Sequence, residues 1–148
     1  MTTPPPLWPV RRPPLVLPVP PSANHQYHPI LRGARAYGMA LTPAARAWKT
    51  EAALLARQWA RRVAWDGSLP TWVVVGFRVT WPDRRAHDLP NLKALWDALE
   101  HILYPNDRWV LPYPFLPTVD RANPHVTLWV YQPDELPPAL LAGPPAPA

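Results

Sequence analysis

The 148-residue sequence contains no cysteine. This absence excludes disulfide bonds, thiolate zinc sites and a cysteine nucleophile. It also agrees with a protein of the cytoplasm, where disulfides are rare.

Long apolar runs are missing as well. No stretch approaches the roughly 20 apolar residues that a membrane-spanning helix needs. The N-terminal segment MTTPPPLWPVRRPP has no continuous apolar core and so lacks the pattern of a secretory signal. We therefore expect a soluble, cytoplasmic protein with no membrane partner.

Acidic residues are fewer than basic ones, 10 against 15, which gives a formal net charge of +5. Thirteen of the 15 cations are arginine. The arginine fork binds phosphate through two parallel hydrogen bonds, which favours a nucleic-acid partner. A GC-rich genome would also enrich arginine, alanine and proline, so the composition alone leaves both explanations open.

Proline is abundant, with 25 residues, and many of them lie near the two ends. Such segments favour polyproline conformation and pack poorly. We expect a proline-rich tail at residues 1–14, one folded domain at residues 15–132, as the chain length suggests, and a second proline-rich tail at residues 133–148.

Hydrophobic periodicity predicts an α+β fold. Residues 43–63 and a segment from Pro90 to about residue 103 have helical spacing, and Thr42-Pro43 is a typical helix start. Four segments have strand character, and residues 20–41 are predicted as a long loop. The expected order is β-α-β-α-β-β, with two helices on a small mixed sheet of about four strands. The predicted strands are residues 15–19, 71–80, 109–116 and 125–131.

Residues 83–97, DRRAHDLPNLKALWD, hold the most informative chemistry. A basic pair, Arg84 and Arg85, precedes the carboxylate of Asp88 at a loop-to-helix junction, and Lys93 follows one turn later. A second loop carboxylate, Asp107, lies downstream. Carboxylates bind hard divalent cations, and basic residues hold a polyanion, so the combination suggests a metal-dependent nuclease.

Each of these residues also has a structural explanation. Asp88 could cap a helix, Asp107 could stabilise a turn, and Lys93 could pair with Asp97 across one helical turn. Their order and spacing, rather than any one residue, favour the nuclease interpretation.

The pattern resembles the RusA family of Holliday junction resolvases. The family has a P-x-P-P-S-x-N segment, found here as PVPPSAN at residues 18–24, followed by a basic glycine-containing segment, RGARAY at residues 32–37. Its central block R-R-x-x-D-x-D-N-x-x-K-x-x-x-D-A-L corresponds to residues 84–99, RRAHDLPNLKALWDAL, and its D-D-x-Q-V loop to residues 106–110, NDRWV. The resemblance covers about residues 15–131.

Two departures fall within the implied active site. Pro90 stands where the family has its second carboxylate, and Asn106 stands for the first Asp of the pair. The spacing from Asp88 to Lys93 is one residue shorter than in the family, which turns the helix by about 100° relative to the loop. The sequence leaves open whether His87, Asp83 or Glu100 completes a rearranged site. A histidine ligand would suit Mn²⁺ better than Mg²⁺.

The resemblance implies a homodimeric endonuclease that binds and symmetrically nicks Holliday junctions or other branched DNA in recombination and repair. The implied metal ligands for Mg²⁺ or Mn²⁺ are Asp88 and Asp107, with Asn106 and His87 as further candidates, and Lys93 is the implied catalytic cation. The expected DNA contacts are Arg32, Arg35, Arg84, Arg85, Asn24 and Tyr27. The alternatives are a RusA-fold protein that binds branched DNA without cleaving it, favoured by Pro90, and an interaction module that uses the proline tails.

Overall fold

The computed structural model describes residues 8–21, 27–85 and 92–143. Its centre is a mixed β-sheet with the strand order β1-β7-β4-β5, in which β6 also pairs with β4. The β7 strand is antiparallel to both β1 and β4, whereas β5 and β6 run parallel to β4. The strands are β1 (Leu15–Leu17), β4 (Val73–Trp81), β5 (Val110–Pro114), β6 (Thr118–Val119) and β7 (His125–Tyr131).

The strand chemistry explains this order. The β4 strand is apolar along nearly its whole length and lies in the sheet interior, where both faces are covered. The β5 strand contains Pro112 and Pro114, which lack an N–H, and it lies at an edge. The α+β class, the mixed sheet and the edge position of the first strand are therefore confirmed.

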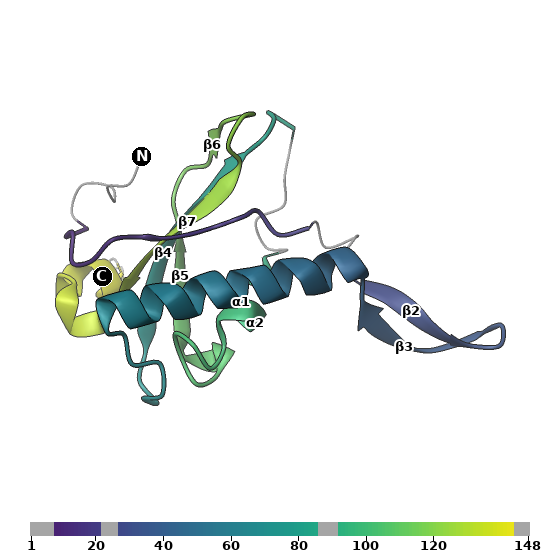
Figure 1. The fold of residues 1–148 in the computed structure, drawn as a ribbon. Helices are drawn as coiled ribbons and strands as arrows, with labels where there is room; N and C mark the ends of the chain where they lie inside the picture. Colours follow the sequence, from purple (N-terminus) through teal and green to yellow (C-terminus); the bar gives the residue numbers. More distant parts are fainter. Residues whose placement is uncertain (1–7, 22–26, 86–91, 144–148) are drawn as a thin grey trace, which may run out of the picture.

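Two helices, α1 (Pro43–Val63) and α2 (Lys93–Leu99), pack on one face of the sheet (Figure 1). The α1 helix begins as predicted, because the Thr42 hydroxyl accepts a hydrogen bond from the Ala45 N–H at 3.2 Å. Its tryptophans Trp48 and Trp59 enter the core. Alternate residues of β1, β4 and β7 meet the helices.

The α2 helix is shorter than predicted. It begins at Lys93 and ends at Leu99, and Pro90, where we expected it to start, lies outside the described residues. The chain then turns sharply, since His101 has a positive φ of 65° and its N–H donates to the Tyr104 carbonyl at 2.7 Å. Leu103 is fully buried, although it lies in this turn rather than on the helix. Apolar spacing thus predicted its burial but not its backbone conformation.

The expectation that both proline-rich ends pack poorly is wrong for their described parts. Trp8 packs against Tyr113, Phe115 and Tyr131 on the sheet face opposite α1. The C-terminal segment, with η4 (Pro133–Glu135) and α3 (Pro138–Ala142), covers the same face through the buried Leu136 and the half-buried Leu140. The second face of the sheet must also be buried, because β4 and β7 carry apolar side chains on both of their faces.

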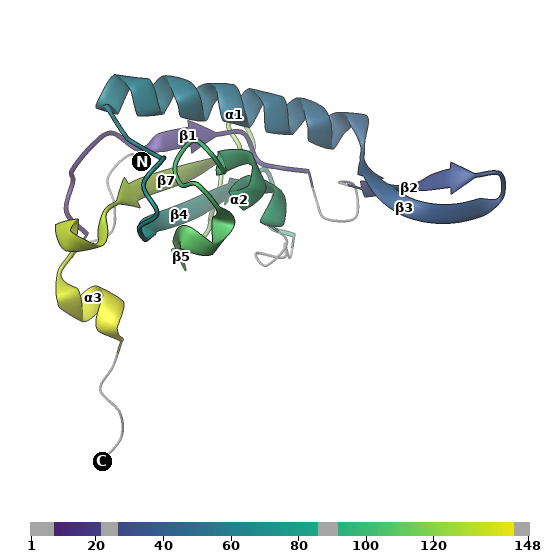
Figure 2. The ribbon, with the colours of Figure 1, turned by 90° about the horizontal axis from the view of Figure 1, so that it is seen from below.

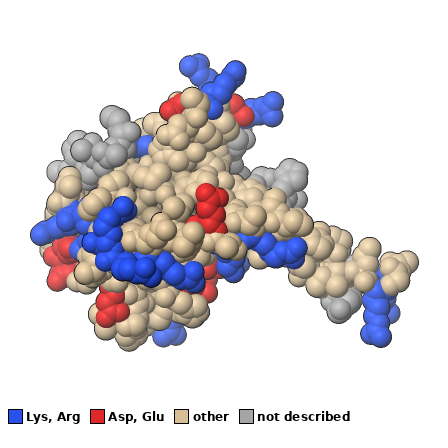
Figure 3. All heavy atoms as spheres, viewed as in Figure 1, with Lys and Arg blue, Asp and Glu red and all other residues tan. Residues whose placement is uncertain are grey.

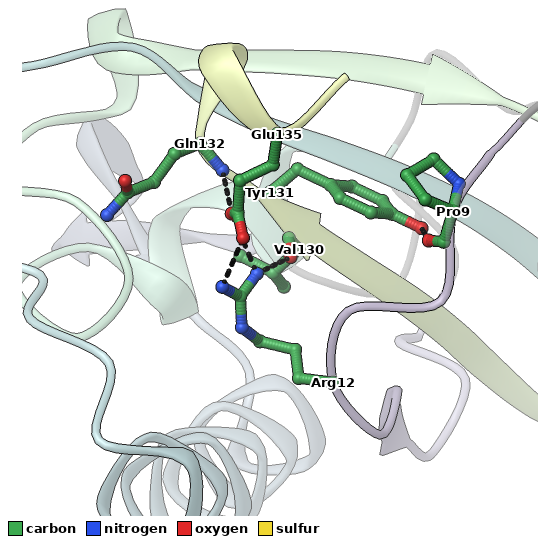
Figure 4. A network of polar contacts seen from close by, with 6 residues as sticks. All are labelled: Pro9, Arg12, Val130, Tyr131, Gln132 and Glu135. Carbon is green, nitrogen blue, oxygen red and sulfur yellow. Dashed lines mark hydrogen bonds and ion pairs between the residues drawn. The ribbon is translucent and has the colours of Figure 1, made fainter. Parts of the chain in front are cut away.

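A polar network joins the two ends (Figure 4). The Arg12 guanidinium donates two hydrogen bonds to the Glu135 carboxylate, at 3.0 and 2.7 Å, and one to the Val130 carbonyl at 2.7 Å. Glu135 also accepts from the Gln132 N–H at 2.8 Å, and the Tyr131 hydroxyl donates to the Pro9 carbonyl at 2.7 Å. Both terminal segments are therefore tied to β7.

Residues 27–41 form a β-hairpin rather than the predicted loop. The strands β2 (Tyr27–Arg32) and β3 (Arg35–Leu41) pair antiparallel and project away from the sheet (Figures 1 and 2). The two-residue turn places Gly33 at a φ of 66°, which glycine adopts without strain. Among the described residues, no helix is both long and apolar enough to cross a membrane.

Candidate active site

The first part of the candidate site lies on α2. Lys93 donates to the Asp97 carboxylate at 3.0 Å, one helical turn away. The Lys93 side chain is 70% exposed, whereas that of Asp97 is 24% exposed. The helix thus holds a cation at its N-terminal end and a half-buried carboxylate further along.

The second part is the turn that carries Asp107. The short 3-10 helix η3 (Asp107–Trp109) is capped by Asn106, whose side-chain oxygen accepts from the Arg108 N–H at 3.0 Å. The Asp107 N–H donates to Glu100 Oε1 at 3.0 Å. This bond places η3 against the residue that follows α2.

Tyr104 follows α2 and forms an isolated β-bridge with Glu100. It is fully buried, and its hydroxyl donates to the Trp96 carbonyl at 2.6 Å. Burial raises the pKa of Tyr104 far above its ordinary value, and the negative charges of Glu100, Asp107 and Asp97 raise this pKa further. The charges of three carboxylates therefore act on one buried phenol, and Lys93 is paired with one of them, Asp97.

The segment that follows α1 contacts the turn between α2 and η3. The Trp65 indole N–H donates to the Leu103 carbonyl at 2.9 Å. Gly67 lies so close to the Ile102 carbonyl that a Cβ at this position would overlap it. These contacts fix the backbone that presents Glu100 and Asp107.

The donor atoms suit a hard divalent cation, since they are carboxylate oxygens. The described residues alone, however, contain no group of three histidine or acidic side chains arranged to hold a metal. Two predicted ligands, His87 and Asp88, lie outside the described residues. The described part thus supplies Asp107 and a neighbouring Glu100 as candidate ligands.

The predicted DNA contacts occupy two separate places. Arg84 and Arg85 are exposed just after β4, where the Arg85 N–H donates to Asp83 Oδ1 at 3.0 Å. Arg32 and Arg35 pair across the hairpin tip and are exposed, away from α2 (Figure 2). Within one chain the structure therefore does not bring the two arginine pairs together. Tyr27 begins β2, and Asn24 lies outside the described residues.

Further basic residues line the exposed side of α1, and Figure 3 shows lysine and arginine side chains along this helix and at the hairpin tip. Sequence reasoning missed Tyr104, the buried phenol whose pKa the neighbouring carboxylates raise. The helical spacing of Lys93, Asp97 and Glu100 was the available signal for that arrangement.

A comparison with models of protein families identifies the family of this chain. The family model described as endodeoxyribonuclease RusA matches residues 18–131. The chain belongs to the RusA family. No curated protein matches it. The matched region begins directly after β1, ends with β7 and includes the hairpin, α1, α2 and η3. RusA membership supports a nuclease of the hydrolase class, consistent with a site of carboxylates and basic side chains.

Proposed function

We propose that this RusA-family protein is a metal-dependent endonuclease that binds Holliday junctions or other branched DNA and nicks them symmetrically. The observation that carries the proposal is the series of charged groups along α2 and the turn after it, where Lys93 pairs with Asp97 and the Asp107 N–H bonds to Glu100, within the region matched by the family. DNA recombination and repair is the corresponding process.

In this proposal Asp107 and Asp88 hold Mg²⁺ or Mn²⁺, with Asn106, His87 or Glu100 completing the ligand set. Such a cation supplies Lewis-acid activation of water and of the phosphate. The Glu100 carboxylate orients the Asp107 backbone through their hydrogen bond. Lys93 stabilises the negative charge that develops on the phosphate in the transition state.

The arginines hold the DNA backbone. Arg84 and Arg85, exposed after the end of β4, form one contact, and Arg32 and Arg35 form a second contact at the hairpin tip. A homodimer supplies two sites related by a two-fold axis, as symmetric cutting of a two-fold junction requires.

The test is cleavage of a synthetic four-way junction by wild type and Asp107→Asn, with Mg²⁺, with Mn²⁺ and with EDTA. We expect Asp107→Asn to abolish cutting and to leave binding nearly intact, because the change removes charge at nearly constant shape. Asp134→Asn is the matched control, since Asp134 is exposed on η4. Equal cutting by wild type in EDTA would reject the metal mechanism.

A second function follows from Pro90, which replaces a family carboxylate: binding of branched DNA without cleavage. Junction binding without nicking at any concentration of either metal would establish that function instead.

A further inference from the structure

Two tryptophans meet at the edge of the sheet beside η3. The parallel register pairs Val73 with Val110, so the residues just before them, Trp72 and Trp109, lie side by side. Their ring centroids are 5.4 Å apart and the ring planes are inclined by 71°. The rings therefore form a corner rather than a flat stack.

Trp72 is unusually open to solvent. All nine tryptophans lie within the described residues, and only Trp72 ranks among the exposed large apolar side chains, at 46% exposed. It belongs to neither buried cluster, whereas Trp109 is half-buried and packs against the core under α1. Packing in the core therefore explains the presence of a tryptophan at Trp109. It does not explain the exposed ring of Trp72.

A cation and the candidate metal ligand adjoin this corner. The exposed Arg108 places its guanidinium 4.9 Å from the centre of the Trp109 ring. Asp107 precedes Arg108 in the same 3-10 turn.

We propose that the exposed Trp72 ring, supported by Trp109, forms a stacking platform for an unpaired DNA base next to the strand that is cut, with Arg108 on the adjoining phosphate. Indole rings bind bases of any sequence by stacking, and arginine adds a phosphate contact. This platform rests on the proposed function and adds to it a means of recognising the unpaired bases of branched DNA.

A nucleic-acid occupant is favoured over a second protein chain because Arg108 and the Asp107 site adjoin the rings. A subunit contact would need a larger apolar surface than one exposed ring provides.

The experiment uses a four-way junction with an unpaired 2-aminopurine beside the branch point, and a fully paired duplex of the same length. Wild type, Trp72→Ala and Trp72→Phe are titrated at equilibrium in EDTA, with Leu54→Ala as the control. Leu54 is 53% exposed on α1. Light scattering and thermal unfolding accompany each variant.

We expect Trp72→Ala to weaken junction binding about tenfold and to abolish quenching of the 2-aminopurine. Trp72→Phe should retain most of both, because phenylalanine still offers an aromatic face, and Leu54→Ala should match wild type. The salt dependence of Trp72→Ala should equal that of wild type, since stacking releases no counterions.

Wild-type affinity and quenching in Trp72→Ala would overturn the platform alone. An equal loss on the paired duplex, or a changed oligomeric state, would also overturn it and identify a general DNA contact or a subunit contact, respectively. Failure of wild type to prefer the junction over the duplex would reject the proposed function, and the platform with it.

Discussion

Removing the ion pair between Arg12 and Glu135 should destabilise the whole domain, because it joins segments more than 100 residues apart. The pair is bidentate, with N–O distances of 3.0 and 2.7 Å, and both side chains are less than one-fifth exposed. Hydrogen bonds to charged groups contribute about 1.5–3 kcal/mol each when they are protected. Because partial exposure and side-chain entropy reduce this figure, we expect a coupling free energy of about 1–2 kcal/mol.

Arg12→Ala alone should lower the free energy of unfolding by about 2–3 kcal/mol, since it also leaves the Val130 carbonyl without this donor. Arg121→Ala is the control, because Arg121 is an exposed arginine in the segment before β7. A double-mutant cycle with Arg12→Ala and Glu135→Ala, measured by urea unfolding at pH 7, isolates the coupling.

The coupling should depend on pH. Burial acts to raise the pKa of Glu135, but the hydrogen bonds from Arg12 and the Gln132 N–H, together with the charge of Arg12, outweigh burial and hold this pKa below its ordinary value of 4.5. The resulting stability is present above pH 4.5 and is lost as the pH falls through the lower, folded-state pKa. Additive single variants at pH 7, or a coupling that persists unchanged at pH 2, would refute the reasoning.

Three further predictions concern DNA, metal and assembly. Arg84→Ala with Arg85→Ala should weaken junction binding and reduce the log-log salt slope by about one unit per lost phosphate contact; an unchanged slope in binding titrations would place the DNA elsewhere. Pro90→Asp should lower the Mg²⁺ or Mn²⁺ concentration needed for cleavage, and superimposable metal titrations of wild type and variant would exclude a site weakened at Pro90. Light scattering should report a homodimer, and a 16.8 kDa monomer at micromolar concentration would contradict that prediction.

Much of the framework was predictable because its signals are local. The hydroxyl of Thr42, the fixed φ of Pro43 and the apolar spacing set the start and buried face of α1 within a few turns of chain. The β-branched and aromatic runs of β4 and β7 likewise identify strands without knowledge of their neighbours. The RusA motifs could be found for the same reason, since the central block occupies one short stretch around Lys93.

The hairpin was predictable in principle but was missed. Two extended runs separated by Gly33-Ala34 are a hairpin signal, because glycine at the first turn position accepts a positive φ. We instead predicted a single long loop for residues 20–41.

Other features depend on contacts that sequence spacing does not encode. Proline-rich composition predicted loose ends, yet Trp8 and Leu136 cover a sheet face that is apolar because β4 is buried on both sides. Arg12 and Glu135 meet only because β7 brings the C-terminal segment beside the N-terminal one.

Some features of the candidate site could likewise be predicted from the sequence, and others could not. The sequence by itself determined the chemistry available, a cation at Lys93 and a carboxylate at Asp107, because residue type and motif order are local properties. Only the tertiary structure decided that Glu100 bonds to the Asp107 backbone, that their charges act on the buried Tyr104, and that Trp72 stands beside Trp109. These neighbours are set by the turn after α2 and by the parallel register of β4 and β5, and neither can be inferred from residues adjacent in the chain.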